Sequence, residues 1–417
     1  MKILMFSWEY PPVSEGGLAR HVQDLSEALV EKGHTVYIIT KGERNIPEKE
    51  QINGVNVLRS DPVKISSNNF IDDILQLNYQ LLEKAFLLSR EIEGEFDLVH
   101  GHDWLVFWAS KVVKHSLLKP LIFTIHATES GRNQGIYNDM QRYINDIEWY
   151  STFEAWKVIV CSNYMKNEVK GLFQLPDDKL TVIENGVNPD NYQTDYSSQF
   201  KGKYVAPGED MIFYVGRIVR EKGIQVLIQA MPELLKEKPS TKLIIAGKGN
   251  FSEDLKRQAR YLGIEDRIYF TGFVSDNVRN KLYQAADVAV FPSLYEPFGI
   301  VALEAMCTGT PVIASNVGGM AEFVEHKENG LKVEPNNPYQ LAHLIQEVLD
   351  NKKEYKKMAK KAQKIVEEKF SWDKIAEKTE KVYKNVLNEY QNCNWNKEID
   401  DTYIDNEEEL VGGYRYR

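Results

Sequence analysis

The stretch "MIFYVGRIVREKGIQVLIQAMPELLKEKPSTKLIIAG", residues 211–247, places a short apolar run, a basic loop, a longer amphipathic run and a second short apolar run in succession. Apolar runs of roughly four to eight residues bounded by glycine are typical of buried strands, whereas a longer periodic run is typical of a helix. A strand, a helix and a strand in this order predict a βαβ unit with parallel strands. We therefore expect strands over 211–216 and 242–247 and a helix over 224–238.

This pattern continues along both halves of the chain. In the second half we expect further strands over 268–273, 287–293 and 311–315, and helices over 252–263, 277–286 and 300–309. In the first half we expect a strand over 2–6, a helix over 18–34 and a strand over 35–40, with later strands within 96–104, 121–128, 156–165 and 179–188. Strands that are apolar throughout indicate parallel sheets covered on both faces. The expected fold class is therefore α/β, with two doubly wound, Rossmann-like domains.

The polar, turn-rich residues 190–208 separate the two halves. We place one domain at 1–195 and a second at 205–371, and expect helices from about 338 to 390. Residues 391–417 are acidic and weakly apolar, which predicts a mobile tail. Two doubly wound sheets that face each other form a cleft between their carboxyl edges, where ligands of open α/β sheets bind.

The composition excludes several classes of function. A chain of 417 residues, 43% of them hydrophobic, is long enough for two packed domains. The net charge of −10 disfavours nucleic acid as a partner, and no stretch reaches the roughly 18 apolar residues of a membrane span. The three cysteines lack metal-binding spacing and the apolar N-terminal run is short for a secretion signal, so we expect a cytoplasmic protein. Peripheral contact with a membrane through a local basic patch stays open.

Two adjacent glycines, Gly16 and Gly17, end the first loop and open the first helix. Glycines at a helix N-terminus let an anion approach the backbone, although a tight turn explains them equally well. They are not part of a G-x-G-x-x-G motif, and no acidic residue ends the second strand, so a nicotinamide dinucleotide is disfavoured.

Polar side chains end two other predicted strands of the first half. His100, His102 and Asp103 end one strand, and His126 ends the next. A metal site is one interpretation, but we favour ligands of sugar hydroxyls or charge stabilisers, and we expect no bound metal. His126 could contact a sugar through its carbonyl or its ring, or act as a general base.

Two cations follow the strand at 211–216. Arg217 and Lys222 stand in the loop, and Gly223 and a helix come directly after. Solvated loop charges are the ordinary interpretation, but the carboxyl end of a strand is where a diphosphate would bind, to arginine in a bidentate way and to lysine as a point charge. Fixed cations stabilise the charge that develops on a leaving diphosphate, and two of them could replace a divalent metal.

A second loop carries carboxylates, in "SLYEPFGIVALEAM", residues 293–306. Glu296 stands before the predicted helix, where it could accept hydrogen bonds from sugar hydroxyls. Glu304 stands within the helix among apolar residues, so it needs partners, either a ribose diol or the protein backbone. The backbone N–H groups that open the helix, and that we expect to face the cleft, are those of Phe298, Gly299, Ile300 and Val301.

Together these motifs resemble glycosyltransferase family 4, the retaining nucleotide-sugar glycosyltransferases that include bacterial and archaeal glycogen and starch synthases. Residues 293–306 carry the family's E-x7-E pattern. The stretches that follow the family's order, from residue 1 to about 390, are "WEYPPVSEGGLARHV", "HGHDW", "FTIH", "VIENGVN", "GRIVREKG" and "TGFV". The resemblance implies a GT-B architecture in which a closing helix at 372–390, beginning at Trp372, packs back on the first domain.

The resemblance also implies roles for residues of the first, acceptor-side domain. Gly16 and Gly17 would lie against the donor phosphates. Asp103 and His126 would lie beside the transferred sugar, with His126 helping to stabilise an oxocarbenium-like transition state.

In the second domain, which would bind the nucleotide sugar, the resemblance implies that Arg217 and Lys222 hold the diphosphate. Glu296 would contact the donor sugar and Glu304 the ribose. Val274, in "TGFV", would lie near the base through its backbone.

One position departs from the family's pattern. Glycogen and starch synthases usually carry Lys-x-Gly-Gly-Leu at the first loop, and this chain has Ser14 where that lysine would stand. A phosphate or acceptor contact is therefore in doubt, which weakens the resemblance to a strict glycogen synthase more than that to a glycosyltransferase.

The function that the resemblance implies is metal-independent, retaining sugar transfer with a nucleotide-diphosphate sugar as donor substrate and no other cofactor. We expect glucose from ADP- or UDP-glucose and an α-glucan or small glucosyl acceptor. Transfer to a lipid or a cell-surface polysaccharide is the alternative within this class, and a nucleotide-sugar epimerase or a non-catalytic sugar-binding protein is the alternative outside it. The sequence leaves open the nucleotide base, the acceptor, the role of the tail and whether the chain forms a homo-oligomer.

Overall fold

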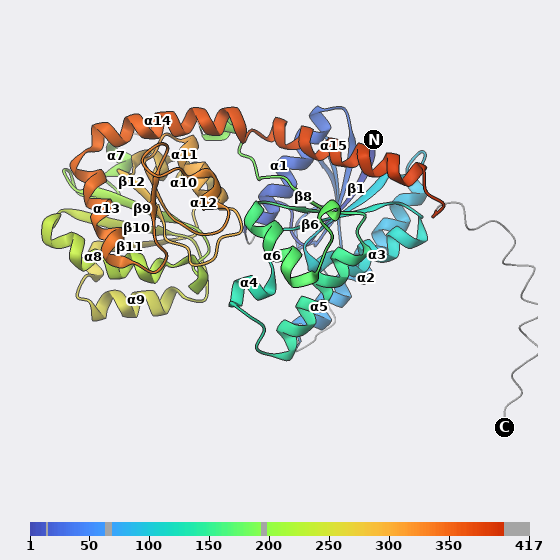
Figure 1. Ribbon diagram of the computed structural model, residues 1–417, viewed down its shortest axis with the longest axis horizontal. Coiled ribbons are helices and arrows are strands. Elements are labelled where there is room, and N and C mark those ends of the chain that lie inside the picture. Colours follow the sequence, from blue (N-terminus) through green and yellow to red (C-terminus); the bar gives the residue numbers. More distant parts are fainter. Residues whose placement is uncertain (14–15, 63–68, 193–197, 396–417) are drawn as a thin grey trace, which may run out of the picture.

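The computed structural model contains two α/β domains, each built on its own sheet (Figure 1). It describes residues 1–13, 16–62, 69–192 and 198–395. The strand order is β3-β4-β2-β1-β5-β6-β7-β8 in the first sheet and β11-β10-β9-β12-β13-β14 in the second. Within the described residues every pairing of named strands is parallel except that of β3 with β4. The predicted α/β class with two doubly wound domains is confirmed.

The first domain alternates strands and helices. Its strands are β1 (Lys2–Ser7), β2 (Thr35–Thr40), β3 (Lys49–Ile52), β4 (Val55–Arg59), β5 (Leu98–His102), β6 (Leu121–Ile125), β7 (Lys157–Val160) and β8 (Leu180–Val182). Its α-helices are α1 (Gly17–Glu31), α2 (Phe70–Glu91), α3 (Phe107–Ser116), α4 (Glu129–Asn133), α5 (Asp139–Glu154) and α6 (Asn163–Phe173). Its 3₁₀ turns are Trp104–Val106, Asp177–Lys179 and Pro189–Tyr192.

The second domain repeats the alternation. Its strands are β9 (Asp210–Val215), β10 (Thr241–Ala246), β11 (Ile268–Gly272), β12 (Val288–Phe291), β13 (Val312–Ser315) and β14 (Leu331–Val333). Its helices are α7 (Ser198–Lys201), α8 (Ile224–Glu237), α9 (Ser252–Tyr261), α10 (Asp276–Ala285), α11 (Ile300–Cys307), α12 (Met320–Phe323), α13 (Pro338–Asp350) and α14 (Lys352–Lys369), with 3₁₀ turns at Arg220–Lys222 and Glu265–Arg267. The strand, helix and strand predicted within 211–247 are β9, α8 and β10.

The two faces of the first sheet bury different sets of side chains, because successive residues of a strand point to opposite faces. In β1, Leu4 and Phe6 pack in a cluster with residues of α2, α3 and α6. Ile3 and Met5 pack in a second cluster with residues of α1 and of the last helix, α15 (Trp372–Gln391). Helices therefore cover both faces, and the strands' carboxyl ends are left to carry the site.

The C-terminal helices link the two domains. Figure 1 shows α14 running along the second domain and α15 along the first. Trp372, Ile375 and Tyr383 of α15 are buried in the cluster that contains Val22 and Leu25 of α1. This arrangement agrees with the crossing back that the resemblance implied.

Some parts of the chain lie outside the described residues. These include Ser14, where the sequence departs from the family's pattern, and positions 396–417, which form most of the predicted mobile tail. Among the helices that the structure describes, none combines the length and the apolar character that a bilayer span requires.

Candidate active site

Hydrogen bonds of Asp103 link the carboxyl ends of β5 and β6. Asp103 directly follows β5 with φ 59°, a left-handed conformation that residues other than glycine rarely adopt. Its Oδ1 accepts a hydrogen bond from the backbone N–H of His126 at 2.8 Å, and its own N–H donates to the carbonyl of Thr124 at 3.0 Å. The structure thus brings Asp103 and His126 together, as their places at strand ends predicted.

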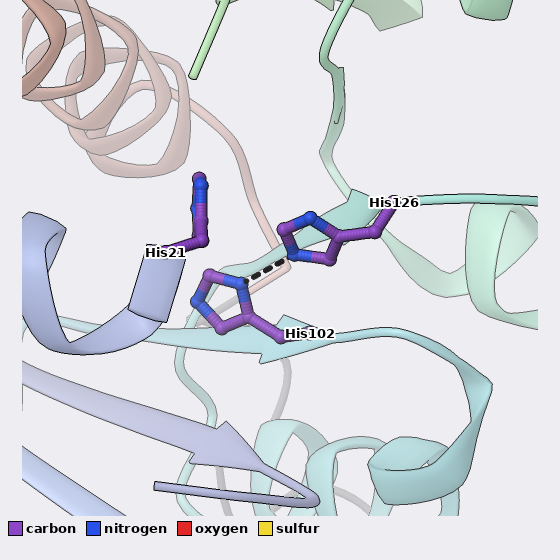
Figure 2. Close-up of side chains that lie close together, drawn as sticks. All are labelled: His21, His102 and His126. Carbon is purple, nitrogen blue, oxygen red and sulfur yellow. Dashed lines mark hydrogen bonds between the residues drawn. The ribbon is translucent and has the colours of Figure 1, made fainter. Parts of the chain in front are cut away.

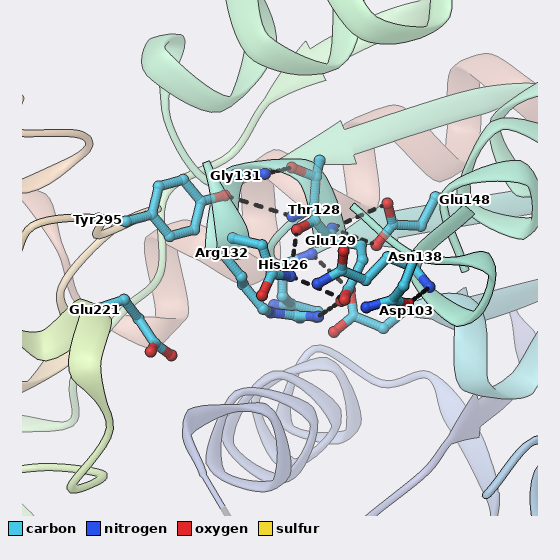
Figure 3. Close-up of polar contacts among 12 residues, drawn as sticks. Asp103, His126, Thr128, Glu129, Gly131, Arg132, Asn138, Glu148, Glu221 and Tyr295 are labelled. Carbon is cyan, nitrogen blue, oxygen red and sulfur yellow. Dashed lines mark hydrogen bonds and ion pairs between the residues drawn. The ribbon is translucent and has the colours of Figure 1, made fainter. Parts of the chain in front are cut away.

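Arg132 of α4 supplies a half-buried charge beside Asp103, in the group of polar residues that Figure 3 shows. Burial, together with the smaller effect of the Arg132 charge, lowers the pKa of His126 to about 3. Burial raises the pKa of Asp103 to about 6, against the attraction of Arg132. The His126 imidazole is therefore neutral near pH 7, so it can accept or donate a hydrogen bond but carries no charge of its own.

His126 belongs to a cluster of three imidazoles, of which the sequence analysis predicted two, His102 and His126. His21 of α1 packs edge-on against His126 with a centroid separation of 4.5 Å, and His102 Nδ1 lies 3.3 Å from His126 Nε2 (Figure 2). His21 Nδ1 donates to Oδ1 of the buried Asn185 at 2.6 Å. His21 was missed by sequence reasoning because it stands on a helix rather than at a strand end.

His100, which the sequence placed with these histidines, makes different contacts. Its Nδ1 lies 2.7 Å from the Tyr383 hydroxyl of α15, and its Nε2 lies 2.7 Å from the Thr124 hydroxyl. Both ring nitrogens are engaged, so His100 helps to hold α15 on the first domain.

Facing these groups, the second domain presents a cation paired with a carboxylate. Lys222 Nζ lies 2.8 Å from Glu296 Oε2, and the Ser293 hydroxyl donates to the same oxygen at 3.1 Å. Arg217 is half exposed, and its Nη2 lies 3.4 Å from Glu221 Oε1. Arg217 and Lys222 are thus both beyond the carboxyl end of β9, where a diphosphate was expected.

The first loop of the first domain meets this region directly. A Cβ added to Gly16 would lie 3.8 Å from Arg217 Cδ, and one added to Gly17 would lie 3.4 Å from Ile300 Cδ1. Gly299, which directly precedes α11, has φ 102°, and a Cβ there would meet Met320 Cγ at 2.4 Å. The first loop therefore lies in van der Waals range of Arg217 and Ile300 across the cleft, whereas Gly299 has no room for a side chain beside Met320.

Glu304 has protein partners on both carboxylate oxygens. It is 3% exposed, with Oε1 accepting from the Tyr192 hydroxyl at 2.9 Å and Oε2 from the Tyr283 hydroxyl at 3.0 Å. Arg279 Nε lies 3.5 Å from Oε2, and Arg20 Nε of the first domain lies 3.9 Å from Oε1. The sequence predicted a buried carboxylate whose partner is a ribose diol or backbone; the structure instead satisfies it with side chains, two of which are cationic.

Other contacts hold the domains together around the site. The Ser162 hydroxyl donates to the Pro297 carbonyl at 2.7 Å, and the Tyr295 hydroxyl donates to Glu168 Oε1 at 2.8 Å. Arg20 also forms an ion pair with Asp276 of α10. None of these contacts has a local signature in the sequence, because each joins residues more than a hundred positions apart.

Two cavities flank the site. One of about 340 Å³ lies between the domains and is lined by Ser130, Gly131, Gln134, Gly135, Tyr164, Glu168, Leu172, Leu294 and Tyr295. Another of about 400 Å³ lies at the carboxyl ends of β9, β10 and β11 and is lined by Ile218, Gly247, Lys248, Gly249, Ser252, Lys256, Phe270 and Gly272. Both volumes fall within the range of small-molecule sites, about 300–1,000 Å³.

The remaining predicted residues take the following places. Val274 stands two residues after Gly272 of the second cavity and is half-buried. Phe298 is buried at 4% exposure, and Ile300 and Val301 open α11 half-buried.

Comparison with known proteins shows relatives along nearly the whole chain. Residues 15–191 match the family model described as Glycosyltransferase Family 4, and residues 197–365 match that of Glycosyl transferases group 1. An uncharacterised glycosyltransferase of Methanocaldococcus jannaschii is 42% identical over 84% of this chain and 90% of its own length. A glycogen synthase of Mycobacterium tuberculosis is 34% identical over 84% of this chain and 86% of its own length.

Among solved structures, sucrose-phosphate synthase of Thermosynechococcus elongatus superposes with a TM-score of 0.79 at 26% identity. The superposition covers 93% of this chain and 99% of that one.

Proposed function

The chain belongs to the GT-B glycosyltransferases of group 1 and family 4, and on that premise we propose that it transfers glucose from ADP- or UDP-glucose, with retention, to an α-glucan or small glucosyl acceptor. Membership of this family favours transfer over the epimerase and sugar-binding alternatives. The resemblance predicted a nucleotide-sugar glycosyltransferase, and the family membership confirms this enzyme class.

The observation that carries the proposal is the Lys222–Glu296 pair, 2.8 Å apart, beside the loop of Gly16 and Gly17. A nucleotide-diphosphate sugar offers one group to each half of the pair. Its diphosphate would attract Lys222, together with Arg217, and its sugar hydroxyls would donate to the carboxylate of Glu296. Cations held in place before the reaction stabilise the leaving diphosphate without needing to reorganise.

On the opposite side of the cleft, Asp103 and His126 would meet the transferred sugar. The hydrogen bond from the His126 backbone to Asp103 fixes their relative position, and the strained backbone of Asp103 indicates a geometry that the fold imposes. A carboxylate near the anomeric carbon would favour the positive charge of an oxocarbenium-like transition state. Glu304 would lie at the ribose end, where the diol would compete with the Tyr192 hydroxyl for Oε1.

The names of two relatives, glycogen synthase and sucrose-phosphate synthase, support glucose as the transferred sugar. The glycogen synthase is the more similar in sequence, which supports a glucan acceptor over a phosphorylated sugar. The three cysteines are unpaired, which supports a reducing compartment such as the cytoplasm.

The test begins with a thermal-shift screen of ADP-, UDP- and GDP-sugars, followed by product analysis with the donor that stabilises most. Glycogen, maltooligosaccharides and a lipid-linked sugar would be offered as acceptors in parallel. We expect elongation of the glucan, and NMR should show an α-linkage formed from an α-linked donor. Exclusive use of the lipid-linked sugar would replace the proposed acceptor, and an inverted linkage would refute retention.

A further inference from the structure

Three imidazoles from separate elements converge behind the proposed sugar site. His21 comes from α1, His102 from the end of β5 and His126 from the residue after β6 (Figure 2). One ring nitrogen of each lies within 4.8 Å of those of the other two. We propose that these three histidines form a binding site for a transition-metal ion of the zinc class.

The spacing of two of the rings already suits a shared ion. His102 Nδ1 and His126 Nε2 are 3.3 Å apart. In a tetrahedral zinc site with Zn–N bonds of about 2.0–2.1 Å, neighbouring ligand nitrogens are about 3.3–3.4 Å apart. An ion bound to both atoms would replace the hydrogen bond between them and the proton that it holds, and the third ring would close on it from within 4.8 Å.

His21 offers a nitrogen that has no other partner. Its Nε2 is buried and makes no hydrogen bond to any residue that the structure describes. Buried ring nitrogens without a partner are uncommon in folded proteins, so each one calls for an explanation. His100 is the internal contrast, since both of its ring nitrogens are engaged.

Asn185 orients His21 in the way that ligating histidines are oriented. The amide oxygen can only accept, so the 2.6 Å contact places the proton on His21 Nδ1 and leaves a lone pair on Nε2. Metal-bound histidines commonly donate their second ring N–H to such an oxygen, which fixes both tautomer and ring direction. Burial also lowers the pKa values of all three histidines, which keeps their lone pairs available.

This site goes beyond the proposed transfer reaction and does not replace any part of it. Lys222 and Arg217 would neutralise the leaving diphosphate, so an ion at the histidines is not needed for departure of that group. An ion bound there would instead hold the ring of His126 and link α1 to the ends of β5 and β6. Three histidine ligands leave a fourth position for water.

The experiment uses the full chain, treated with EDTA, dialysed and titrated with Co²⁺ while the visible absorption is recorded. Co²⁺ in a four-coordinate site of this kind absorbs far more strongly than the hydrated ion. We expect such bands to saturate at one Co²⁺ per chain and to disappear when Zn²⁺ displaces the cobalt. His102→Gln and His21→Gln should abolish the bands, whereas His343→Gln, at an exposed position of α13, should leave them unchanged.

Asn185→Ala keeps all three histidines, so it tests the site even if the histidine variants do not fold. Loss of its hydrogen bond should weaken Co²⁺ binding roughly 10- to 100-fold, the usual effect of removing such a partner. Absence of the bands in the wild-type chain, their survival in a folded His102→Gln variant, or unaltered affinity in Asn185→Ala would each overturn the proposal. These readouts do not involve sugar transfer, so they are independent of the proposed function.

Discussion

The ammonium of Lys222 lies 2.8 Å from the carboxylate of Glu296, and this contact joins the loop before α8 to the loop before α11. The two charges neutralise each other in a partly buried place, where either alone would be costly to keep. Both loops stand at the carboxyl edge of the second sheet, so a donor that enters there meets the pair first. In the proposed enzyme the donor separates the two residues, each of which then acts on a different part of it.

Lys222→Ala and Arg217→Ala should each lower kcat roughly 10²–10³-fold, by analogy with the loss of one donor to a developing oxyanion. The melting temperature should change little in Arg217→Ala, because Arg217 is half exposed. In Lys222→Ala it should fall, because the buried carboxylate of Glu296 loses its cation. Arg220→Ala is the matched control, since Arg220 is an exposed cation in the same 3₁₀ turn. Turnover near the wild-type rate in either variant would show that the diphosphate binds elsewhere.

Glu296→Ala should weaken binding of the intact nucleotide sugar and leave binding of the bare nucleoside diphosphate almost unchanged. Hydrogen bonds to a charged group contribute about 1.5–3 kcal/mol, so the dissociation constant of the sugar nucleotide should rise about 10- to 100-fold. Isothermal titration calorimetry with both ligands measures the difference. Equal losses for the two ligands would mean that Glu296 acts on the nucleotide, through Lys222, and not on the sugar.

Chelation tests the absence of a catalytic metal at the diphosphate. Because Arg217 and Lys222 would supply the positive charge, EDTA should leave the initial rate of transfer largely intact. The same should hold for protein from which zinc has been removed at the three histidines. An enzyme whose rate depends strictly on added Mg²⁺ or Mn²⁺ would contradict this mechanism.

Much of the fold followed from local pattern. Residues 211–247 fold as predicted because their apolar strands are buried on both faces and Gly223, with φ 69°, allows the sharp entry into α8. Strand β3 (Lys49–Ile52) escaped prediction because its sequence, "KEQI", is polar. It is an edge strand that pairs on one side only, so no apolar run is required there.

The residues of the candidate site were predictable only where a polar or charged side chain follows the end of a strand. Asp103, His126 and Glu296 stand directly after a strand or on the loop that follows one, and the topology of doubly wound sheets then places them at the cleft. Arg20 and Arg132 stand on helices and reach the site through tertiary packing alone. Helical periodicity does not distinguish a cation that meets a distant carboxylate from one that faces solvent.

Glu148 should make the free energy of unfolding fall as the pH rises, which is the reverse of the usual effect of a carboxyl group. Its pKa is raised from 4.5 to about 8, chiefly by burial and to a smaller extent by the charges of Asp103 and Glu129. The charge of Arg132 and a backbone hydrogen bond from Glu129 act in the opposite direction. Between these two pH values the folded protein binds a proton that the unfolded chain releases. The contribution of this proton to the free energy of unfolding is therefore complete below about pH 4.5 and is lost as the pH rises through about 8.

Glu148→Gln cannot ionise and keeps an oxygen for the Glu129 N–H, which donates to Glu148 Oε1 at 2.9 Å. Its melting temperature should therefore rise relative to that of the wild type as the pH is raised from about 5 to about 9, across the interval in which the wild type loses this contribution. Glu83→Gln, at an exposed position of α2, should follow the wild-type curve throughout. If the two melting curves stayed parallel across this range, the Glu148 carboxyl would not be protonated in the folded state.

Glu304 combines two roles that one substitution can separate. Its carboxylate accepts from Tyr192 and Tyr283 and lies beside Arg20 and Arg279, so it helps to hold the first domain against the second. From the sequence alone we expect Glu304→Gln to lose little stability, because a costly buried charge is removed. The structure predicts the opposite, since the substitution removes a buried carboxylate beside two partly buried guanidinium groups, which would then keep only the more exposed Asp276 as an ionic partner.

We therefore expect Glu304→Gln to lower the free energy of unfolding by on the order of 1–3 kcal/mol, seen as a melting temperature several degrees lower. If the ribose diol also binds this carboxylate, the affinity for the bare nucleotide, measured by calorimetry on folded protein, should fall about 10- to 100-fold. Glu367→Gln, at an exposed position of α14, should change neither quantity. Lower stability with unchanged nucleotide affinity would make Glu304 a residue of the domain interface alone. A loss of affinity without a loss of stability would show that the two arginines do not depend on it.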